Sequence, residues 1–185
     1  NILIRTHHCD EITYQIEYDE VWIKDEMTWK IPIYKVDQIP ANETHIELLK
    51  LRYNMNSASV DKLRRYLSEV YCKFLDDSKL QINVNGVPIS PINFENFSGH
   101  PEYSPQEYTI TVFTTYGEKA IVRILAGVTT ASSVSEYGVY LYCNERLIVK
   151  AVKDENVGAS LHPECAIAKV ILFINGSADL MPWNS

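Results

Sequence analysis

Residues 60–76 read VDKLRRYLSEVYCKFLD, and they carry the clearest periodic pattern in the chain. Apolar side chains recur there every three or four positions, as in a helix with one apolar face. Asp61 near the start and Lys73 near the end suit the helix dipole. A hydroxyl at Ser57 or Ser59 can cap the first turn. We therefore expect a long amphipathic helix that runs to about Asp76, with an apolar face made of Val60, Leu63, Leu67, Val70, Tyr71 and Phe74.

After this helix, short apolar segments alternate with turn residues. Residues 80–84 and 87–89 flank Asn85-Gly86, a pair that accepts the positive φ angles of a tight hairpin turn. A second hairpin is expected between residues 108–114 and 120–125, around Tyr116-Gly117. A third is expected between residues 137–142 and 146–149, around Asn144-Glu145. Residues 168–174 form a last, more continuous apolar strand.

Before the helix, the chain also shows the alternation of β-strands. Residues 12–18 and 29–36 each alternate apolar with polar side chains, and Pro32 suggests that the second strand lies at a sheet edge. An acidic turn over residues 19–22 joins them, and residues 45–51 form a further strand. The sequence therefore predicts an α+β protein with a mostly antiparallel sheet. We place a domain boundary between residues 53 and 54.

Composition narrows the class of protein. The 185 residues are 46% hydrophobic and 22% charged, as in a globular chain of one domain, or of one domain with part of another. A net charge of -7 disfavours a nucleic-acid clamp, which usually has a basic excess. No apolar run approaches the roughly 20 residues of a membrane span, and no cationic leader is present. The four cysteines form no Cys-x-x-Cys pair, so we expect a reduced, cytoplasmic protein, and the initial Asn suggests a piece of a longer chain.

Metal and catalytic sites have only weak candidates. Alternate residues of His7-His8-Cys9-Asp10 could converge on one strand face, but no second ligand pair accompanies them, so a polar strand end is the favoured interpretation. Cys143, or Cys165 with the nearby His162, could act as a nucleophile, yet neither lies in a hydrolase motif. We therefore predict no metal site and no catalytic residue.

Two surface patterns could mark contacts with partners. A basic helix face could contact nucleic acid, although a solvated helix surface is the simpler interpretation in an acidic protein. This basic face comprises Lys62, Arg64, Arg65 and Lys73. Exposed aromatic residues could form a protein interface. The candidates are Trp22, Tyr103, Tyr116 and Trp183.

Five segments also follow one another in a family-specific order. Residues 44–52 look like the strand that closes a nucleotide-binding sheet. Residues 63–71 and the hairpin over residues 80–88 look like the start of a transducer domain. The most specific segments are YGVYLYCNERLI over residues 137–148 and FINGSADLMPWNS over residues 173–185. Together they resemble the GHKL ATPases (gyrase, the large heat-shock chaperones, histidine kinases and MutL), in their MORC-like bacterial branch.

This resemblance implies two regions with different tasks. Residues 1–53 would be the terminal strands of the ATP-binding domain. Residues 54–185 would be a transducer-like βαβ domain, which couples ATP binding and hydrolysis in the parent protein to conformational change or dimer closure. Thr44 is the one position carried over as a nucleotide contact, with Glu43 where the family has glycine. The family's catalytic glutamate, Mg-binding asparagine and adenine-binding aspartate have no counterpart here, so ATP and Mg²⁺ are expected only in the parent protein.

The resemblance also implies a coupling loop and partners. The loop senses the γ-phosphate in relatives, and an ordinary strand exit is the alternative interpretation of its base here. The residues of that base are Asp179, Pro182, Trp183, Asn184 and Ser185. The implied partners are the missing ATPase domain and a second copy in a homodimer, with neither membrane nor nucleic acid. Two other functions stay open: a stand-alone protein-interaction domain without nucleotide dependence, and a Cys/His hydrolase.

Overall fold

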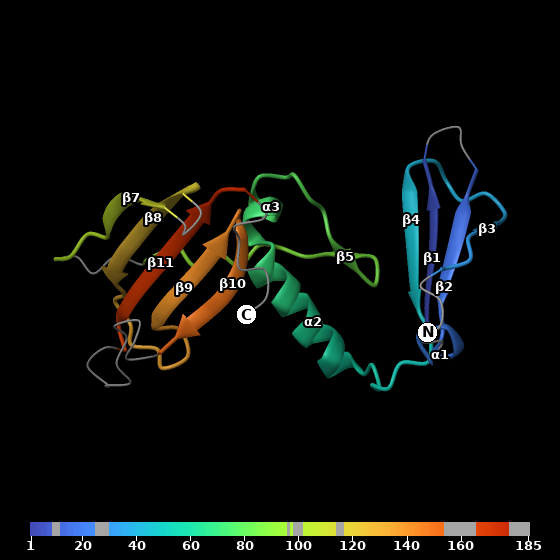
Figure 1. The fold of residues 1–185 in the computed structure, drawn as a ribbon. Coiled ribbons are helices and arrows are strands. Elements are labelled where there is room, and N and C mark those ends of the chain that lie inside the picture. Colours follow the sequence, from blue (N-terminus) through green and yellow to red (C-terminus); the bar gives the residue numbers. More distant parts are fainter. Residues whose placement is uncertain are drawn as a thin grey trace. The chain divides into compact units, whose positions relative to one another are not determined.

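The computed structural model describes residues 1–8, 12–24, 30–95, 97, 102–113, 117–153 and 166–177. The chain divides into two compact units, Asn1–Met55 and Asn56–Ser185, each with its own sheet (Figure 1). Each unit contains at least one helix and a sheet of mainly antiparallel strands. The expected α+β class is therefore confirmed.

The first unit is a small antiparallel sheet. Its strands lie in the order β3-β2-β1-β4. The elements are β1 (Ile2–His7), β2 (Tyr14–Tyr18), α1 (Glu20–Lys24), β3 (Tyr34–Lys35) and β4 (Glu43–Leu48). The paired registers place Ile4 between Ile16 and Ile46, because directly opposed residues share one face of a sheet.

Several sequence expectations for this unit were wrong. The predicted turn over residues 19–22 is the start of α1, because Asp19 Oδ1 accepts a hydrogen bond from Trp22 N at 2.7 Å and caps the helix. Within the described part of residues 29–36, only Tyr34–Lys35 is a strand. Pro32 lacks a backbone donor, which fits the late start of this edge strand. Strand β1, at the centre of the sheet, was not predicted.

In the second unit the predicted long helix is two helices. Helix α2 (Ser57–Val70) and helix α3 (Cys72–Asp76) are separated at Tyr71, whose φ of -105° and ψ of 17° leave the helical region. The cap is Asn56 rather than Ser57 or Ser59, because Asn56 Oδ1 accepts the hydrogen bond of Ser59 N at 2.9 Å. Cys72, at the start of α3, lies in the core cluster of this unit.

The sheet of the second unit has the order β10-β9-β11-β8-β7. All its neighbours pair antiparallel except β9 and β11, which are parallel. The strands are β7 (Gln106–Phe113), β8 (Lys119–Val128), β9 (Gly138–Cys143), β10 (Arg146–Val152) and β11 (Ala168–Asn175). A separate hairpin joins β5 (Asn83–Val84) to β6 (Val87–Pro88).

Two predicted hairpin turns are confirmed. Asn85 and Gly86 have φ angles of 54° and 75°, and Asn144 and Glu145 have φ angles of 44° and 70°. Two successive positive φ angles make the turn whose twist matches that of paired strands. The predicted hairpin between residues 108–114 and 120–125 also forms, between β7 and β8. Tyr116 in its turn lies outside the described residues.

The core of this unit lies between the helices and one face of the sheet. Strand β11 occupies the centre, and its alternate residues Lys169, Ile171 and Phe173 are buried. Around them a single cluster unites α3, the segment before β7 and three strands. Its members are Cys72, Phe94, Tyr140, Tyr142, Leu147, Ile171 and Phe173.

Candidate functional site

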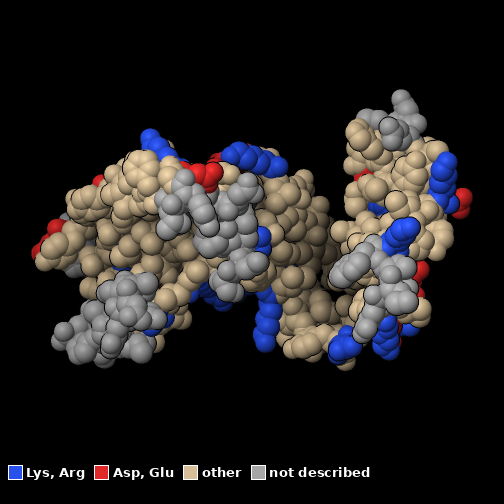
Figure 2. All heavy atoms as spheres, in the orientation of Figure 1, with Lys and Arg blue, Asp and Glu red and all other residues tan. Residues whose placement is uncertain are grey.

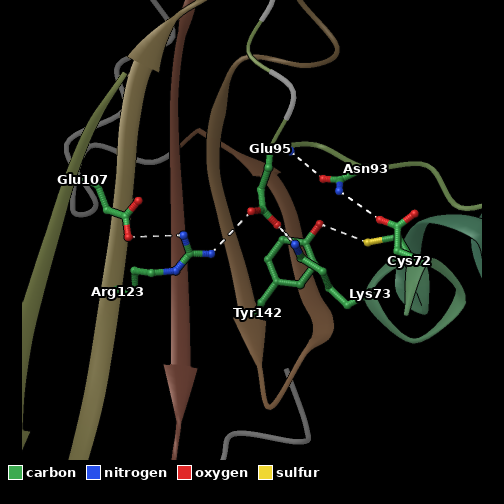
Figure 3. A network of polar contacts seen from close by, with 8 residues as sticks. Cys72, Lys73, Asn93, Glu95, Glu107, Arg123 and Tyr142 are labelled. Carbon is green, nitrogen blue, oxygen red and sulfur yellow. Dashed lines mark hydrogen bonds and ion pairs between the residues drawn. The ribbon is translucent and has the colours of Figure 1, made fainter. Parts of the chain in front are cut away.

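A charged junction forms where α3 meets the sheet, and Glu95 lies at its centre (Figure 3). Its carboxylate pairs with Lys73 from α3 and with Arg123 from β8, the latter at 3.4 Å. Asn93 holds the segment in place: its Oδ1 accepts from Glu95 N at 2.8 Å, and its Nδ2 donates to Asp76 at 3.1 Å. One carboxylate therefore ties a helix, a connecting segment and a strand together.

Arg123 extends this junction across the sheet. Its Nη1 lies 3.4 Å from Glu107 Oε1 on β7, and its guanidinium lies 4.0 Å from the centre of the Phe173 ring on β11. The Phe173 ring in turn stacks on Tyr142 at 5.1 Å. A planar guanidinium is suited to pairing with carboxylates while it rests on an aromatic face. The contact chain therefore runs from α3 to the outer strand β7.

A second acidic residue fastens α2 to the sheet. Glu69 is only 8% exposed, and its Oε1 lies 2.6 Å from Lys150 Nζ on β10 and 3.0 Å from Arg65 Nε. A buried carboxylate is costly unless it is paired and hydrogen-bonded. Its two cationic partners meet this need, so the position of α2 against β10 depends on this group.

These contacts make the junction a structural connection between the helices and the sheet. Its carboxylates are held by cations, and its thiol, Cys72, lies 3.6 Å from Tyr142 OH. Burial raises the pKa of Cys72 and that of Tyr142, so both stay protonated at neutral pH.

A lysine on β11 lies beside a small polar cavity. Lys169 is buried among the rings of Phe94, Phe97 and Tyr140, with its Nζ 5.4–5.9 Å from their centres. Burial lowers the pKa of its ammonium group. The cavity has a volume of about 140 Å³ and includes Glu136 in its lining. Ligand pockets usually measure about 300–1,000 Å³, so a few water molecules fit this space better than a substrate.

The basic helix face is mostly engaged within the protein. Lys73 and Arg65 pair with Glu95 and Glu69, and Arg64 donates a hydrogen bond to Val84 O at 3.4 Å. Figure 2 shows lysines and arginines dispersed among uncharged and acidic residues on the face in view. Phosphate binding needs free cationic side chains along one surface. These pairings therefore favour a structural role for this helix face.

The predicted nucleotide contact lies on strand β4. Thr44 is exposed, and its Oγ1 is 2.9 Å from Thr6 Oγ1 on the neighbouring strand. The adjacent Glu43 pairs with His45, at 2.8 Å between Oε2 and Nε2. Thr44 therefore has an accessible hydroxyl, and its contact with nucleotide stays a prediction.

The predicted coupling loop, Asp179 and residues 182–185, lies outside the described residues. The structure does describe the chain just before it. At the end of β11, Gly176 N donates to Asn144 Oδ1 at 3.1 Å, and Asn144 Nδ2 donates to Gly176 O at 3.0 Å. The turn between β9 and β10 thus fixes the direction in which the chain leaves β11.

The candidate metal cluster is described only in part, since Cys9 and Asp10 lie outside the described residues. His7 is buried, and its Nδ1 lies 2.9 Å from Thr13 Oγ1. Across the described residues, no group of three or more His, Cys, Asp or Glu side chains is arranged to hold a metal ion. His7 thus has a structural partner in Thr13.

The candidate nucleophile Cys143 is buried, and burial raises the pKa of its thiol, whereas a reactive cysteine needs a lowered pKa. His162 and Cys165 lie outside the described residues. We expect Cys72 and Cys143 to react with a thiol reagent at least about 100-fold more slowly in the folded than in the urea-unfolded chain. Mass spectrometry after timed labelling would resolve each cysteine. Fast labelling of Cys143 in the folded chain would instead support the hydrolase alternative.

The comparisons with known proteins leave the family open, because no known family matches the chain and no curated protein is significantly similar to it. Among the described residues, no helix is long and apolar enough to cross a membrane.

Sequence reasoning missed the acidic residues at the centre of this site. Glu69 had a local signal, because Arg65 precedes it by one helical turn. Glu95 had none, since its partners come from positions 73 and 123, far away in the chain. Only the assembled sheet brings these groups together.

Proposed function

We propose that this chain is part of a GHKL-type ATP-binding protein. In this proposal, the first unit supplies terminal strands of the ATP-binding sheet. The second unit is the transducer-like βαβ domain, with α2 as its long amphipathic helix. It couples ATP binding and hydrolysis in the parent protein to conformational change or dimer closure. The chain alone has no catalytic role, and its direct partner is the ATPase domain of the parent.

The observation that carries this proposal is an apolar face on the first sheet that is largely exposed among the described residues. Strands β1, β2 and β4 direct isoleucines, leucine and tyrosines to one side. On this side Ile46 is 60% and Leu48 is 56% exposed. The only helix among the described residues of this unit is the five-residue α1. A sheet with one apolar face requires a second layer, which the remaining ATP-binding domain would supply.

The second unit has the connections that coupling requires. Glu69 and Glu95 tie α2 and α3 to β10 and β8, and Asn144 fixes the exit of β11. A change in nucleotide state that moves the chain beyond β11 would act on this fixed exit. This displacement would then pass through the sheet to the helices. The second unit would behave as a two-state element whose equilibrium a ligand shifts.

The proposal also implies where the cofactors bind and where the protein is located in the cell. ATP and Mg²⁺ would bind in the parent protein, with Thr44 as the contribution of this chain. Phosphoryl transfer depends on positioned metal and charge, which the residues recognised here do not provide. We infer a cytoplasmic protein that works away from membranes and without direct contact to nucleic acid.

A stand-alone protein-interaction domain is the second candidate. The first unit favours it, because large apolar side chains such as Val21 on α1 (76% exposed) and Ile33 just before β3 (65% exposed) lie at its surface. Exposed apolar patches commonly mark sites of protein association. This alternative predicts a defined partner whose binding is indifferent to ATP.

Calorimetric titration distinguishes these functions. We expect the 185-residue chain to bind neither Mg-ATP nor a non-hydrolysable analogue. The parent protein should bind both with a micromolar Kd, equivalent to about -8 kcal/mol. In the parent, Thr44→Ala should weaken binding about tenfold, which is the contribution of one hydrogen bond to a charged group. Thr109→Ala, at an exposed position on β7, is the matched control and should leave Kd unchanged. A parent protein that does not bind ATP would refute the proposal.

A further inference from the structure

Strand β4 presents an open edge. Within the described residues it pairs with β1 on one side and with no strand on the other (Figure 1). All six of its residues, Glu43–Leu48, are exposed. An unpaired edge of this length offers a row of backbone donors and acceptors to another strand.

The ladder with β1 shows which backbone groups point outward. Asn1 and Leu49 exchange both hydrogen bonds, Leu49 N to Asn1 O at 2.8 Å and Asn1 N to Leu49 O at 3.0 Å. In an antiparallel ladder such pairs recur at every second residue, so Glu47, His45 and Glu43 also bond inward to β1. The N–H and C=O groups of Thr44, Ile46 and Leu48 therefore point away from the sheet.

The side chains of this edge are sorted by face. Thr44, Ile46 and Leu48 lie on the apolar face, where the register aligns Ile46 with Ile4. Glu43, His45 and Glu47 lie on the other face, with one imidazole between two carboxylates. Glu47 also pairs with Arg5, at 3.0 Å. This alternation of carboxylates with an imidazole along a single strand restricts which second strand can pair with it.

We propose that β4 pairs with β4 of a second copy of this chain, antiparallel and centred on Ile46. In this register Ile46 faces Ile46, and Thr44 faces Leu48, through the outward hydrogen-bonding groups. His45 then faces Glu47 of the second copy, and this contact occurs twice. The pair is of the non-hydrogen-bonded type, in which side chains lie closest, with Cα atoms about 4.5 Å apart. An imidazole N–H can donate a hydrogen bond to a carboxylate across such a pair, and polar cross-strand pairs of this kind stabilise a sheet.

The neighbouring symmetric register, centred on His45, is less favourable. It places Glu43 opposite Glu47 of the second copy, twice, and His45 opposite His45. Like charges directly opposite each other destabilise a strand pair. Of the two symmetric registers that overlap most of Glu43–Leu48, the charge pattern thus favours the one centred on Ile46.

The two four-stranded sheets would join into one continuous sheet, and the two-fold axis would keep both apolar faces on the same side. This inference concerns the β4 edge alone and does not rest on the nucleotide proposal. ATP titration and the self-association measurements below therefore fail or succeed independently.

Charge variants test both the partner and the register. Sedimentation equilibrium of the wild-type chain should show a monomer–dimer equilibrium. His45→Glu and Glu47→Lys should each weaken the dimer by about tenfold or more. The first places two glutamates opposite each other twice, and the second twice replaces the carboxylate that faces His45 with an ammonium group. An equimolar mixture of the two variants should recover the affinity as a heterodimer. Its two cross-strand pairs would be Glu with Lys and Glu with His.

A backbone variant tests the strand edge separately. Ile46→Pro removes an N–H that points outward and bonds to no group of β1, so the monomer should keep its circular dichroism spectrum while the dimer is lost. Ile46→Val keeps this N–H and is the matched control, with dimerisation retained. A monomeric wild-type chain at high micromolar concentration would overturn the inference. A dimer that Glu47→Lys tightens, or that Ile46→Pro leaves intact, would also overturn it.

Discussion

Replacing Gly138 with alanine is expected to lower the free energy of unfolding of the second unit by about 3 kcal/mol or more. Gly138 opens β9 with a φ of 118°, which side-chain-bearing residues rarely adopt. A Cβ there would also lie 2.5 Å from Val152 O and 3.1 Å from Ala151 C on the neighbouring strand. Both contacts are with backbone atoms, so the strand pair itself would have to move.

Gly86→Ala is the matched control for this substitution. Gly86 has a φ of 75°, and a Cβ there would meet no atom within 4 Å. It should therefore cost only the conformational strain of about 1–2 kcal/mol. Urea unfolding followed by circular dichroism measures both values. Equal losses for the two variants would show that close packing at Gly138 contributes nothing.

Ile171→Ala is expected to cost about 3–4 kcal/mol. Ile171 is fully buried on the central strand β11, within the cluster that joins α3 to the sheet. Its removal leaves a cavity that the paired strands on both sides cannot easily fill. Leu172→Ala removes a side chain of similar volume from the other, half-buried face of the same strand.

The Leu172 variant should lose only about 1–2 kcal/mol, because its site is already partly solvated. The difference in the free energy of unfolding between the two variants is read from their urea midpoints at a common m-value. It measures how much more the buried face of β11 contributes to stability than the half-buried face. A larger loss for Leu172→Ala would place the core on the opposite face of the sheet.

The parts of the fold that could be predicted are those determined by neighbouring residues. Asn85-Gly86 and Asn144-Glu145 define turns because of their own backbone preferences, and the hairpins follow from them. The periodicity of residues 60–76 predicted helix, but the break at Tyr71 and the packing of α3 against the core are not visible in that pattern. Local patterns contain no information about that packing.

Other features depend on contacts between distant positions. Strand β1 begins with Ile2-Leu3-Ile4, which breaks the apolar–polar alternation because Leu3 is buried on the face opposite its neighbours. The parallel pairing of β11 with β9 is a choice of topology, which the apolar run over residues 168–174 does not specify. The charged junction at Glu95 arises only after that topology exists, so sequence analysis found cysteines and histidines instead.

The place of β11 in the sheet has a consequence for synthesis on the ribosome. Strands β7 to β10 emerge first and can form two hairpins, but β8 and β9 are not neighbours in the finished sheet. The inner edges of both hairpins, on β8 and β9, must stay open until β11, translated last among these strands, enters between them. Nascent chains with unpaired strand edges are prone to aggregate and are typical clients of chaperones. Protection during the last steps of translation would therefore govern the yield of this protein.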